Sequence, residues 1–311
     1  MEKISVILPV YRTARCIEEL HRRLTATLAT TGCDYELLFI DDGSPDDAWP
    51  ILQAVAKLDP HVKAVRLTRN FGQHPAISAG FSLAAGDALV LMDADLQDRP
   101  EDLPVLLTKL SPTVDIVYTA KLEDSESLIS RVTSRIYHYV FSRLTRTAIP
   151  AKIGTLRVFS RRVLQSLLAY PEYNVLYGPL MFYVGFQFEV VTVNRDARVH
   201  GTSGYTFRKR LALAVSSLIS YTDIPHRVLV NMGISIILGS VLYSIALVIR
   251  YLVSSGELPP GLTLLALLNT FSLGTITLGI GVLGIYIFRV FQEVLRRPRF
   301  LVSETLNIDV K

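Results

Sequence analysis

Residues 88–98 read Ala-Leu-Val-Leu-Met-Asp-Ala-Asp-Leu-Gln-Asp, a short apolar run that ends in acidic side chains. The apolar part is typical of a strand that is buried on both faces of a sheet. Asp93 and Asp95 follow it two positions apart, a spacing that in an extended chain directs both carboxylates to the same side. Because two carboxylates aimed at one point repel each other unless a cation lies between them, the stretch predicts a strand that leads into a metal site.

Similar apolar runs recur on both sides of this stretch and alternate with segments of helical periodicity. The predicted strands are 4–10, 36–40, 62–67, 88–92 and 115–118, and the predicted helices are 16–29, 46–57, 75–85 and 100–110. This alternation predicts an α/β fold, a Rossmann-like, mostly parallel sheet with helices on both faces. Ligands of such sheets bind at the carboxyl ends of the strands.

Candidate site residues, most of them polar, gather at the carboxyl ends of four successive strands. They are Pro9 and Tyr11, Asp41 and Asp42, Arg69 and Gln73, and finally Asp93, Asp95 and Gln97. A site with a small number of hard oxygen ligands from the protein suits Mg²⁺ or Mn²⁺, because these cations keep waters and bind substrate phosphates. The alternative is an acidic loop that caps the helix predicted from residue 100. This alternative is disfavoured because the other polar residues lie at the same rim of the predicted sheet.

The composition limits the class of protein. The chain has 311 residues, a formal net charge of +4, 50% hydrophobic residues and a mean hydropathy of +0.35. This excludes a disordered chain. The two cysteines, Cys16 and Cys33, are too few for a disulfide scaffold and are interpreted as free thiols. No cleavable signal precedes the first predicted strand, so we expect that strand to begin in the cytoplasm.

Two long uncharged runs near the C-terminus predict a pair of membrane spans, at 228–252 and 262–288 within the segment 228–289. The first contains 22 uncharged residues, 228–249, and the second contains 27. At about 1.5 Å per residue each is long enough for the hydrocarbon core. Buried helices of a soluble protein are the disfavoured alternative, since they seldom run this long without charge. The motif Gly279-Ile-Gly281-Val-Leu-Gly284 lies inside the second run and is interpreted as helix packing, not as a nucleotide site.

Charges beside the two runs predict the orientation. Arginine and lysine residues are concentrated before the first run and after the second. Both termini are therefore expected on the cytoplasmic side of an inner, multi-pass membrane protein, with 290–311 as a cytosolic tail. Two basic amphipathic segments, 125–149 and 206–227, are predicted to lie at the lipid surface, although solvated surface helices are the general alternative. Arg131 and Arg135, four positions apart, could clamp one phosphate group.

Four motifs, 7–11, 41–44, 69–73 and 93–97, resemble those of family 2 glycosyltransferases with the GT-A fold. More narrowly, they are similar to the polyprenyl-phosphate branch, which includes dolichyl-phosphate mannose synthase, bactoprenol glucosyltransferases and the undecaprenyl-phosphate aminoarabinose transferase. The resemblance covers nearly the whole chain, with a GT-A domain at 1–205. Residues 198–205 resemble the branch's R-x-x-G-x-S-x-Y block, which basic residues follow.

The resemblance implies an enzyme that transfers a sugar, with inversion, from a nucleotide-sugar to polyprenyl (undecaprenyl) phosphate at the cytoplasmic membrane face. A UDP-sugar is the expected donor and a GDP-sugar stays open, as does the sugar itself. Pro9, Tyr11 and Asp41 would hold the base and ribose, while Asp42, Arg69, Gln73 and Asp93 would complete the donor side. Asp93, Asp95 and Gln97 would surround Mg²⁺ or Mn²⁺. The catalytic set implied is Asp93, Asp95, Arg131, Arg135, Arg198, Ser203 and Lys209.

Three departures from the family pattern bear on this assignment. Arg12 and Thr13 replace a common Asn-Glu, and Gly204 replaces a lysine. Relatives often carry an aspartate that aligns with Thr155 or, alternatively, with Ala151, so it is missing here in either alignment. That aspartate has been assigned as a base or as a group that positions the acceptor. A phosphate monoester has a second pKa near 6 and is largely a dianion at neutral pH, so no proton needs to be removed from it. It needs positioning and charge screening instead.

Two other functions remain open at this stage. One is a processive polysaccharide synthase, which typically needs more spans. The other is a non-catalytic membrane partner that binds nucleotide without forming product. A nucleic-acid binder is disfavoured because the basic residues cluster beside the predicted spans. A homo-oligomer formed through the spans is expected.

Overall fold

The computed structural model describes residues 1–121, 153–170, 172–173, 175–194, 231–236 and 261–308, with isolated positions between 238 and 253. The chain forms two compact units, which are described separately. The first comprises residues 1–210 and 298–311, and the second comprises residues 211–297. The predicted interfacial segments 125–149 and 206–227 lie outside the described residues.

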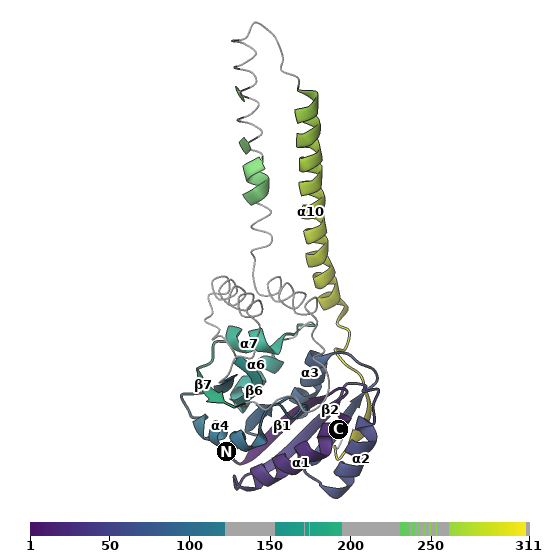
Figure 1. The fold of residues 1–311 in the computed structure, drawn as a ribbon, viewed down its shortest axis with the longest axis vertical. Coiled ribbons are helices and arrows are strands. Elements are labelled where there is room, and N and C mark those ends of the chain that lie inside the picture. Colours follow the sequence, from purple (N-terminus) through teal and green to yellow (C-terminus); the bar gives the residue numbers. More distant parts are fainter. Residues whose placement is uncertain are drawn as a thin grey trace. The chain divides into compact units, whose positions relative to one another are not determined.

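One eight-stranded sheet forms the centre of the first unit (Figure 1). Its strands are β1 (Lys3–Val10), β2 (Asp34–Asp41), β3 (Val62–Leu67), β4 (Ala88–Leu91), β5 (Ile116–Lys121), β6 (Ile153–Ser160), β7 (Phe188–Val193) and β8 (Val302–Leu306), in the order β7-β5-β6-β4-β1-β2-β3-β8. The central strands β3, β2, β1 and β4 run parallel, and β5 pairs parallel with β7. Strands β6 and β8 pair antiparallel with their neighbours. The predicted α/β fold with a mostly parallel sheet is confirmed.

Helices follow the strands in the predicted alternation. They are α1 (Ala14–Ala29), α2 (Ala48–Leu58), α3 (Gln73–Leu83), the 3₁₀ turn η1 (Pro100–Asp102), α4 (Leu103–Lys109), α6 (Arg161–Leu168) and α7 (Tyr177–Tyr183). The elements predicted up to residue 121 agree with these bounds to within three residues at each end. The sequence did not indicate β6, β7 or β8.

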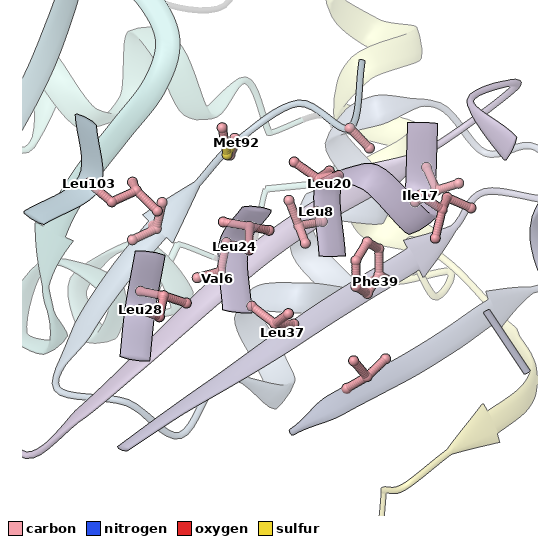
Figure 2. Close-up of a cluster of buried hydrophobic side chains, with 14 of the residues drawn as sticks. Val6, Leu8, Ile17, Leu20, Leu24, Leu28, Leu37, Phe39, Met92 and Leu103 are labelled. Carbon is pink, nitrogen blue, oxygen red and sulfur yellow. The ribbon is translucent and has the colours of Figure 1, made fainter. Parts of the chain in front are cut away.

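Leucine side chains of α1 cover one face of the central strands. Figure 2 shows Leu20, Leu24 and Leu28 of this helix against alternate residues of β1 and β2, such as Val6 and Leu37. The helix presents these leucines because apolar positions recur every three to four residues along it. All five side chains are fully buried, so each contributes roughly 1.5–3 kcal/mol to folding. This packing fixes the sheet under the loops that follow its strands.

Helix α3 covers the opposite face and lies very close to the sheet. A Cβ added at Gly80 would lie 2.5 Å from Cγ2 of Ile7 on β1 and 3.4 Å from Cγ1 of Ile40 on β2. No side chain fits at this position. The close contact holds the first turn of α3, with Gln73 and His74, beside the carboxyl ends of the parallel strands.

Strand β8 comes from the far end of the chain and adds the last strand to the sheet beside β3 (Figure 1). The flanking loop is also fixed, because the Thr68 backbone N–H donates to the Leu301 carbonyl at 2.9 Å. Asn307 then donates to the carbonyls of Ala56 and Val62, both at 2.8 Å. Residues around 298–308 therefore belong structurally to the first unit.

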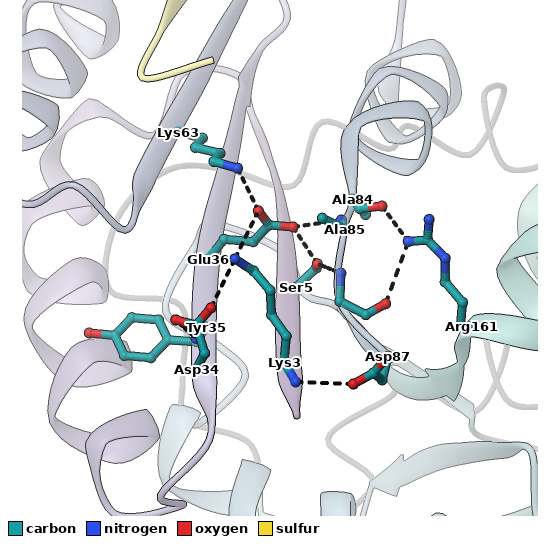
Figure 3. A network of polar contacts seen from close by, with 11 residues as sticks. Lys3, Ser5, Asp34, Tyr35, Glu36, Lys63, Ala84, Ala85, Asp87 and Arg161 are labelled. Carbon is teal, nitrogen blue, oxygen red and sulfur yellow. Dashed lines mark hydrogen bonds and ion pairs between the residues drawn. The ribbon is translucent and has the colours of Figure 1, made fainter. Parts of the chain in front are cut away.

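A buried carboxylate joins strands at the amino-terminal edge of the sheet (Figure 3). Glu36 is 1% exposed and accepts hydrogen bonds from the Ser5 hydroxyl at 2.5 Å, the Ala85 backbone N–H at 2.7 Å and Lys63 Nζ at 2.8 Å. Burial by itself would raise the pKa of Glu36, but these donors outweigh burial and the net pKa is lowered. Glu36 thus ties β1 and β2 to β3 and to the turn before β4, opposite the predicted site.

We expect Glu36→Ala to lower the free energy of unfolding of the first unit by about 3 kcal/mol, because it leaves buried donors without an acceptor. The folded-state pKa of Glu36 is below its ordinary value. Its stabilising contribution is therefore present above the ordinary pKa of a glutamate and is lost as the pH falls through the lower folded-state value. Trp49, the sole tryptophan of the chain, reports unfolding of this unit.

The matched control is Glu189→Ala, which removes an ion pair with Lys109 whose side chains are 39% and 45% exposed. Such exposed pairs contribute at most about 1 kcal/mol. Equal losses for the two variants would contradict the role assigned to Glu36.

The second unit contains α10 (Leu262–Leu295), a helix of 34 residues that covers the predicted second span. It ends at Arg296, whose φ of 47° lies in the left-handed region. Within the part of the chain that the structure describes, no helix combines the length and hydropathy that crossing a membrane requires. Both predicted spans therefore stay predictions.

Candidate functional site

The carboxyl ends of β1, β2, β3 and β4 meet at one rim of the sheet, as predicted. Val10 at the end of β1 lies opposite Asp41 of β2, which in turn lies opposite Arg66 of β3. On the other side of β1, Ile7 lies opposite Leu91 of β4 and accepts a hydrogen bond from the Met92 N–H at 3.1 Å. The loops that carry the predicted donor and metal residues therefore start from adjacent strands.

Asp42 holds two of these loops together. Its carboxylate accepts hydrogen bonds from the backbone N–H groups of Phe71 at 2.7 Å and Gly72 at 2.8 Å, in the loop that follows β3. Gly72 has a φ of 105°, which residues with a side chain rarely adopt. Burial raises the pKa of Asp42 to about 6, although the two N–H donors lower it. Asp42 is thus a loop anchor that titrates close to neutral pH.

We expect donor binding to weaken as the pH falls through about 6, because protonated Asp42 loses its charge toward the Phe71 and Gly72 N–H groups. The donor KM measured between pH 5 and 8 should rise on the acidic side. An Asp42→Asn variant should show the raised KM across the whole range and lose the transition. An unchanged transition in that variant would assign it to another group.

Asp41, next to Asp42, has one oxygen that accepts no hydrogen bond from the residues that the structure describes. Its Oδ1 accepts from the Ser44 backbone N–H at 2.8 Å. Its Oδ2 is buried without a hydrogen-bond partner, and Arg66 Nε lies 3.5 Å from it. The side chain is 0% exposed, and burial raises its pKa. A buried carboxylate oxygen of this kind is suited to accept a hydrogen bond from a ligand hydroxyl group.

Asp93 and Asp95 follow β4 on the same rim. Gln73 Nε2 donates to Asp93 Oδ1 at 3.0 Å, and the Gln97 backbone N–H donates to Asp95 Oδ1 at 3.2 Å. Leu96, between Asp95 and Gln97, has a φ of 60°, which marks a tight turn in the left-handed region. Asp95 is 9% exposed and Asp93 is half-buried.

The donor set of this turn fits a hard divalent cation. It offers carboxylate oxygens from Asp93 and Asp95 and an amide oxygen from Gln97, the ligand types that Mg²⁺ and Mn²⁺ prefer. Among the described residues, no group of three or more His, Cys, Asp or Glu side chains could hold a metal ion. A cation at this turn would therefore need oxygen ligands other than acidic side chains, such as phosphate oxygens or waters.

The predicted residues Pro9, Tyr11 and Arg69 also lie at this rim, with more exposed side chains. Tyr11 is 41% exposed, and the guanidinium carbon of Arg12 lies 5.4 Å from the centre of its ring. The Arg12 backbone N–H donates to the Ser44 hydroxyl at 3.1 Å, which joins this turn to the loop after β2. The guanidinium carbon of Arg69 lies 4.2 Å from the ring centre of Phe71. Both cations thus lie over aromatic rings at the rim.

Thr155, which replaces the expected family aspartate, contacts another carboxylate of the site. Its hydroxyl donates to Asp98 Oδ2 at 3.1 Å, and Asp98 is 1% exposed. A carboxylate at position 155 would face that of Asp98, and two buried like charges repel each other. Thr155 instead gives Asp98 a hydrogen-bond donor.

Two further polar residues near the rim were not singled out from the sequence as site residues. Arg157 of β6 is half-buried, and burial lowers its pKa although the charges of Asp93 and Asp98 raise it. Burial also lowers the pKa of His74 to about 4, and its Nδ1 has no hydrogen-bond partner. An arginine within a strand could have indicated the first of these.

The remaining predicted site residues, Arg131, Arg135, Arg198, Ser203 and Lys209, lie outside the described residues. Their roles stay predictions. Cys16 and Cys33 are free cysteines, as expected.

Comparison with known proteins identifies the group to which this architecture is similar. Residues 5–168 match the family model described as Glycosyl transferase family 2. An undecaprenyl-phosphate 4-deoxy-4-formamido-L-arabinose transferase of Salmonella paratyphi A is 32% identical over 309 residues, which cover 98% of this chain and 94% of that protein. The uncharacterized glycosyltransferase YkcC of Bacillus subtilis is 31% identical over 308 residues, with coverages of 99% and 95%.

Solved structures extend the similarity of the fold. Glucosyl-3-phosphoglycerate synthase from Mycobacterium tuberculosis in complex with phosphoglyceric acid superposes with a TM-score of 0.54 at 21% identity, over 72% of this chain and 81% of that one. The same enzyme with Mn²⁺, uridine diphosphate and phosphoglyceric acid gives a TM-score of 0.52 at 18% identity, over 72% and 80%. These identities support a shared fold.

Proposed function

The chain belongs to glycosyl transferase family 2 and is a glycosyltransferase, and from this premise we propose that it transfers a sugar from a UDP-sugar to undecaprenyl phosphate, with inversion. The observation that supports nucleotide binding at this site is Asp41 Oδ2, which is buried and accepts no hydrogen bond from the described residues. It lies at the rim where four parallel strands end. The similarity over 98% of the chain to a transferase named for undecaprenyl phosphate supports the acceptor.

The donor nucleotide would bind across the ends of β1, β2 and β3. Asp41 accepts a hydrogen bond from a ribose hydroxyl, and Tyr11 and Pro9 border the base. Asp42 keeps the loop with Arg69 and Gln73 in place beside them. The solved fold relative that contains uridine diphosphate supports a uracil base, and a GDP-sugar is the alternative donor that the assay below includes.

A divalent cation would be held by Asp93, Asp95 and Gln97, with donor phosphate oxygens completing its ligands. When bound, it supplies positive charge for the diphosphate that leaves as the sugar bond breaks. Gln73 orients Asp93 through its hydrogen bond of 3.0 Å to Oδ1. The fold relative with Mn²⁺ supports a cation of this class, and Mg²⁺ fits the same oxygen ligands.

The acceptor phosphate would attack the anomeric carbon from the side opposite the diphosphate. Since this phosphate is already largely a dianion at neutral pH, the chain does not require a base at position 155. We assign its positioning to Arg131 and Arg135 and to the loop with Arg198, Ser203 and Lys209. The sequence motifs support this assignment.

Membrane attachment follows from the lipid acceptor, and we propose the hairpin of spans 228–252 and 262–288 as the anchor. Its support is the two uncharged runs and the path of the chain. Residues up to 210 and from 298 onward belong to one compact unit, so a chain that crosses a bilayer between them crosses it an even number of times. The basic residues before the first run and after the second assign this shared side, with the first unit and both termini, to the cytoplasm.

The decisive experiment is a transfer assay with the full chain in membranes. Labelled UDP- and GDP-sugars are incubated with undecaprenyl phosphate and either Mg²⁺ or Mn²⁺, with EDTA as the metal-free arm. We expect label from one donor to enter the organic phase only with a divalent cation. Nucleotide binding without organic-phase label from any donor would instead support a non-catalytic partner, and polymeric product would support a processive synthase.

A further inference from the structure

Three charged residues lie directly opposite one another on three adjacent strands at the rim. Asp41 of β2 pairs with Arg66 of β3, and Arg66 pairs with Glu304 of β8. Residues that lie opposite each other in a sheet project from the same face, so the register alone places these side chains in one row. The row links the donor site to a strand from the far end of the chain.

The contacts within this row are specific. Arg66 Nε lies 3.5 Å from Asp41 Oδ2, while Arg66 Nη1 lies 3.2 Å from Glu304 Oε1. The second oxygen of Glu304 accepts a hydrogen bond from Trp49 Nε1 at 3.1 Å. Trp49 is 3% exposed, and the guanidinium carbon of Arg66 lies 5.8 Å from its ring centre. Glu304 is therefore fixed by a buried tryptophan and in turn fixes one end of Arg66.

We propose that Glu304 is a positioning residue of the donor site, which holds Arg66 so that Asp41 Oδ2 stays available to the nucleotide. The inference rests on the proposed role of Asp41 in donor binding. Arg66 has two anionic neighbours in the row, one at each end of its guanidinium group. With Glu304 charged, Arg66 is shared between the two carboxylates, with Nε 3.5 Å from Asp41 Oδ2 and Nη1 3.2 Å from Glu304 Oε1.

Removal of the charge at position 304 changes this balance. Asp41 becomes the one remaining carboxylate in the row, and a planar guanidinium pairs best with a carboxylate through two parallel N–H bonds. Arg66 then turns onto Asp41 and occupies the oxygen that a ribose hydroxyl would use. The folded state changes little, because the Arg66 and Glu304 side chains are 37% and 48% exposed and such pairs contribute little to stability.

The test is a double-mutant cycle between Glu304→Gln and Asp41→Asn, with UDP as the probe and Mn²⁺ present. Affinity is measured by calorimetry on the full chain and independently by the emission of Trp49. We expect each single variant to weaken UDP binding by about tenfold and the double variant to bind no more weakly than Asp41→Asn. In the transfer assay, Glu304→Gln should raise the donor KM and leave kcat and the acceptor KM unchanged.

Ser303→Ala is the matched control on the same strand. It removes a hydrogen bond of 3.1 Å from the Ser303 hydroxyl to the Arg66 carbonyl without a change of charge, so UDP affinity should stay as in the parent chain. Additive losses in the cycle, or an unaltered affinity in Glu304→Gln, would overturn the role of Glu304. An unaltered affinity in Asp41→Asn would instead overturn the proposed donor site. A loss in Ser303→Ala equal to that in Glu304→Gln would show that docking of β8 alone, and not the charge, controls the site.

Discussion

An Asp95→Ala variant is expected to lose sugar transfer by roughly 10³-fold in kcat while the first unit stays folded. Asp95 lies in the turn after β4, where its Oδ1 accepts the local hydrogen bond from the Gln97 N–H. Its proposed part in the reaction is to hold the cation that takes up charge on the leaving diphosphate. That charge develops mainly in the transition state, so the loss should appear in kcat and not only in the donor KM.

The measurement is the initial rate of organic-phase product at saturating donor and acceptor, together with Mn²⁺ binding in the presence of UDP. Asp34→Ala is the matched control, because it removes a carboxylate of β2 that is 57% exposed and forms an ion pair with Lys3 at the amino-terminal edge of the sheet. That variant should turn over at the parent rate. Near-normal turnover of Asp95→Ala, or unchanged Mn²⁺ binding, would remove the metal site from the mechanism.

The turn with Asp95 belongs to the part of the fold, from β1 to β4, that the sequence could predict. Strands β1 to β4 pair in parallel and are largely buried, so their sequences are mostly apolar runs that stop where the polar rim begins. The rim residues then follow from the rule that parallel strands end at one edge. Placement of Asp41, Asp42, Gln73 and Asp93 beside one another was predictable for this reason.

The antiparallel strands could not be predicted in the same way, because their pairing depends on distant partners. β8 reads Val-Ser-Glu-Thr-Leu and is partly exposed, so its apolar pattern is weak. It is a strand because β3 offers an unpaired edge at that point. The roles of Arg66 and Glu304 depend on this register, and no spacing in the sequence indicates that residues so far apart are neighbours. β6 was obscured by the half-buried Arg157, which interrupts its apolar run.

Substitution of Gly43 is expected to impair the protein as strongly as substitution of an acidic residue of the rim. Gly43 has a φ of 61°, and a Cβ added there would lie 2.6 Å from the carbonyl carbon of Arg69 and 2.8 Å from the Asn70 nitrogen. Both are backbone atoms, so no side-chain rotation relieves the contact. The turn after β2 and the loop after β3 therefore touch at this point, next to the hydrogen bonds that Asp42 forms with Phe71 and Gly72.

We expect Gly43→Ala to destabilise the first unit by about 3 kcal/mol, from left-handed backbone strain together with displacement of the loop after β3. The same displacement should raise the donor KM about tenfold or more, because it moves the Asp42 anchor and Arg69 apart. The changes are measured as the free energy of unfolding followed by Trp49 fluorescence and as the initial rate over a donor series.

The Gly32→Ala variant separates the effect of backbone strain from the effect of loop displacement. Gly32 has a φ of 68°, close to that of Gly43, but no atom lies within 4 Å of its added Cβ. This variant carries the backbone strain alone, about 1–2 kcal/mol, and should keep the parent donor KM. If both variants lose equal stability and keep the parent KM, the contact between the two loops does not position the donor. A KM raised in Gly43→Ala alone means that the approach of the two backbones, which only glycine permits, shapes the donor site.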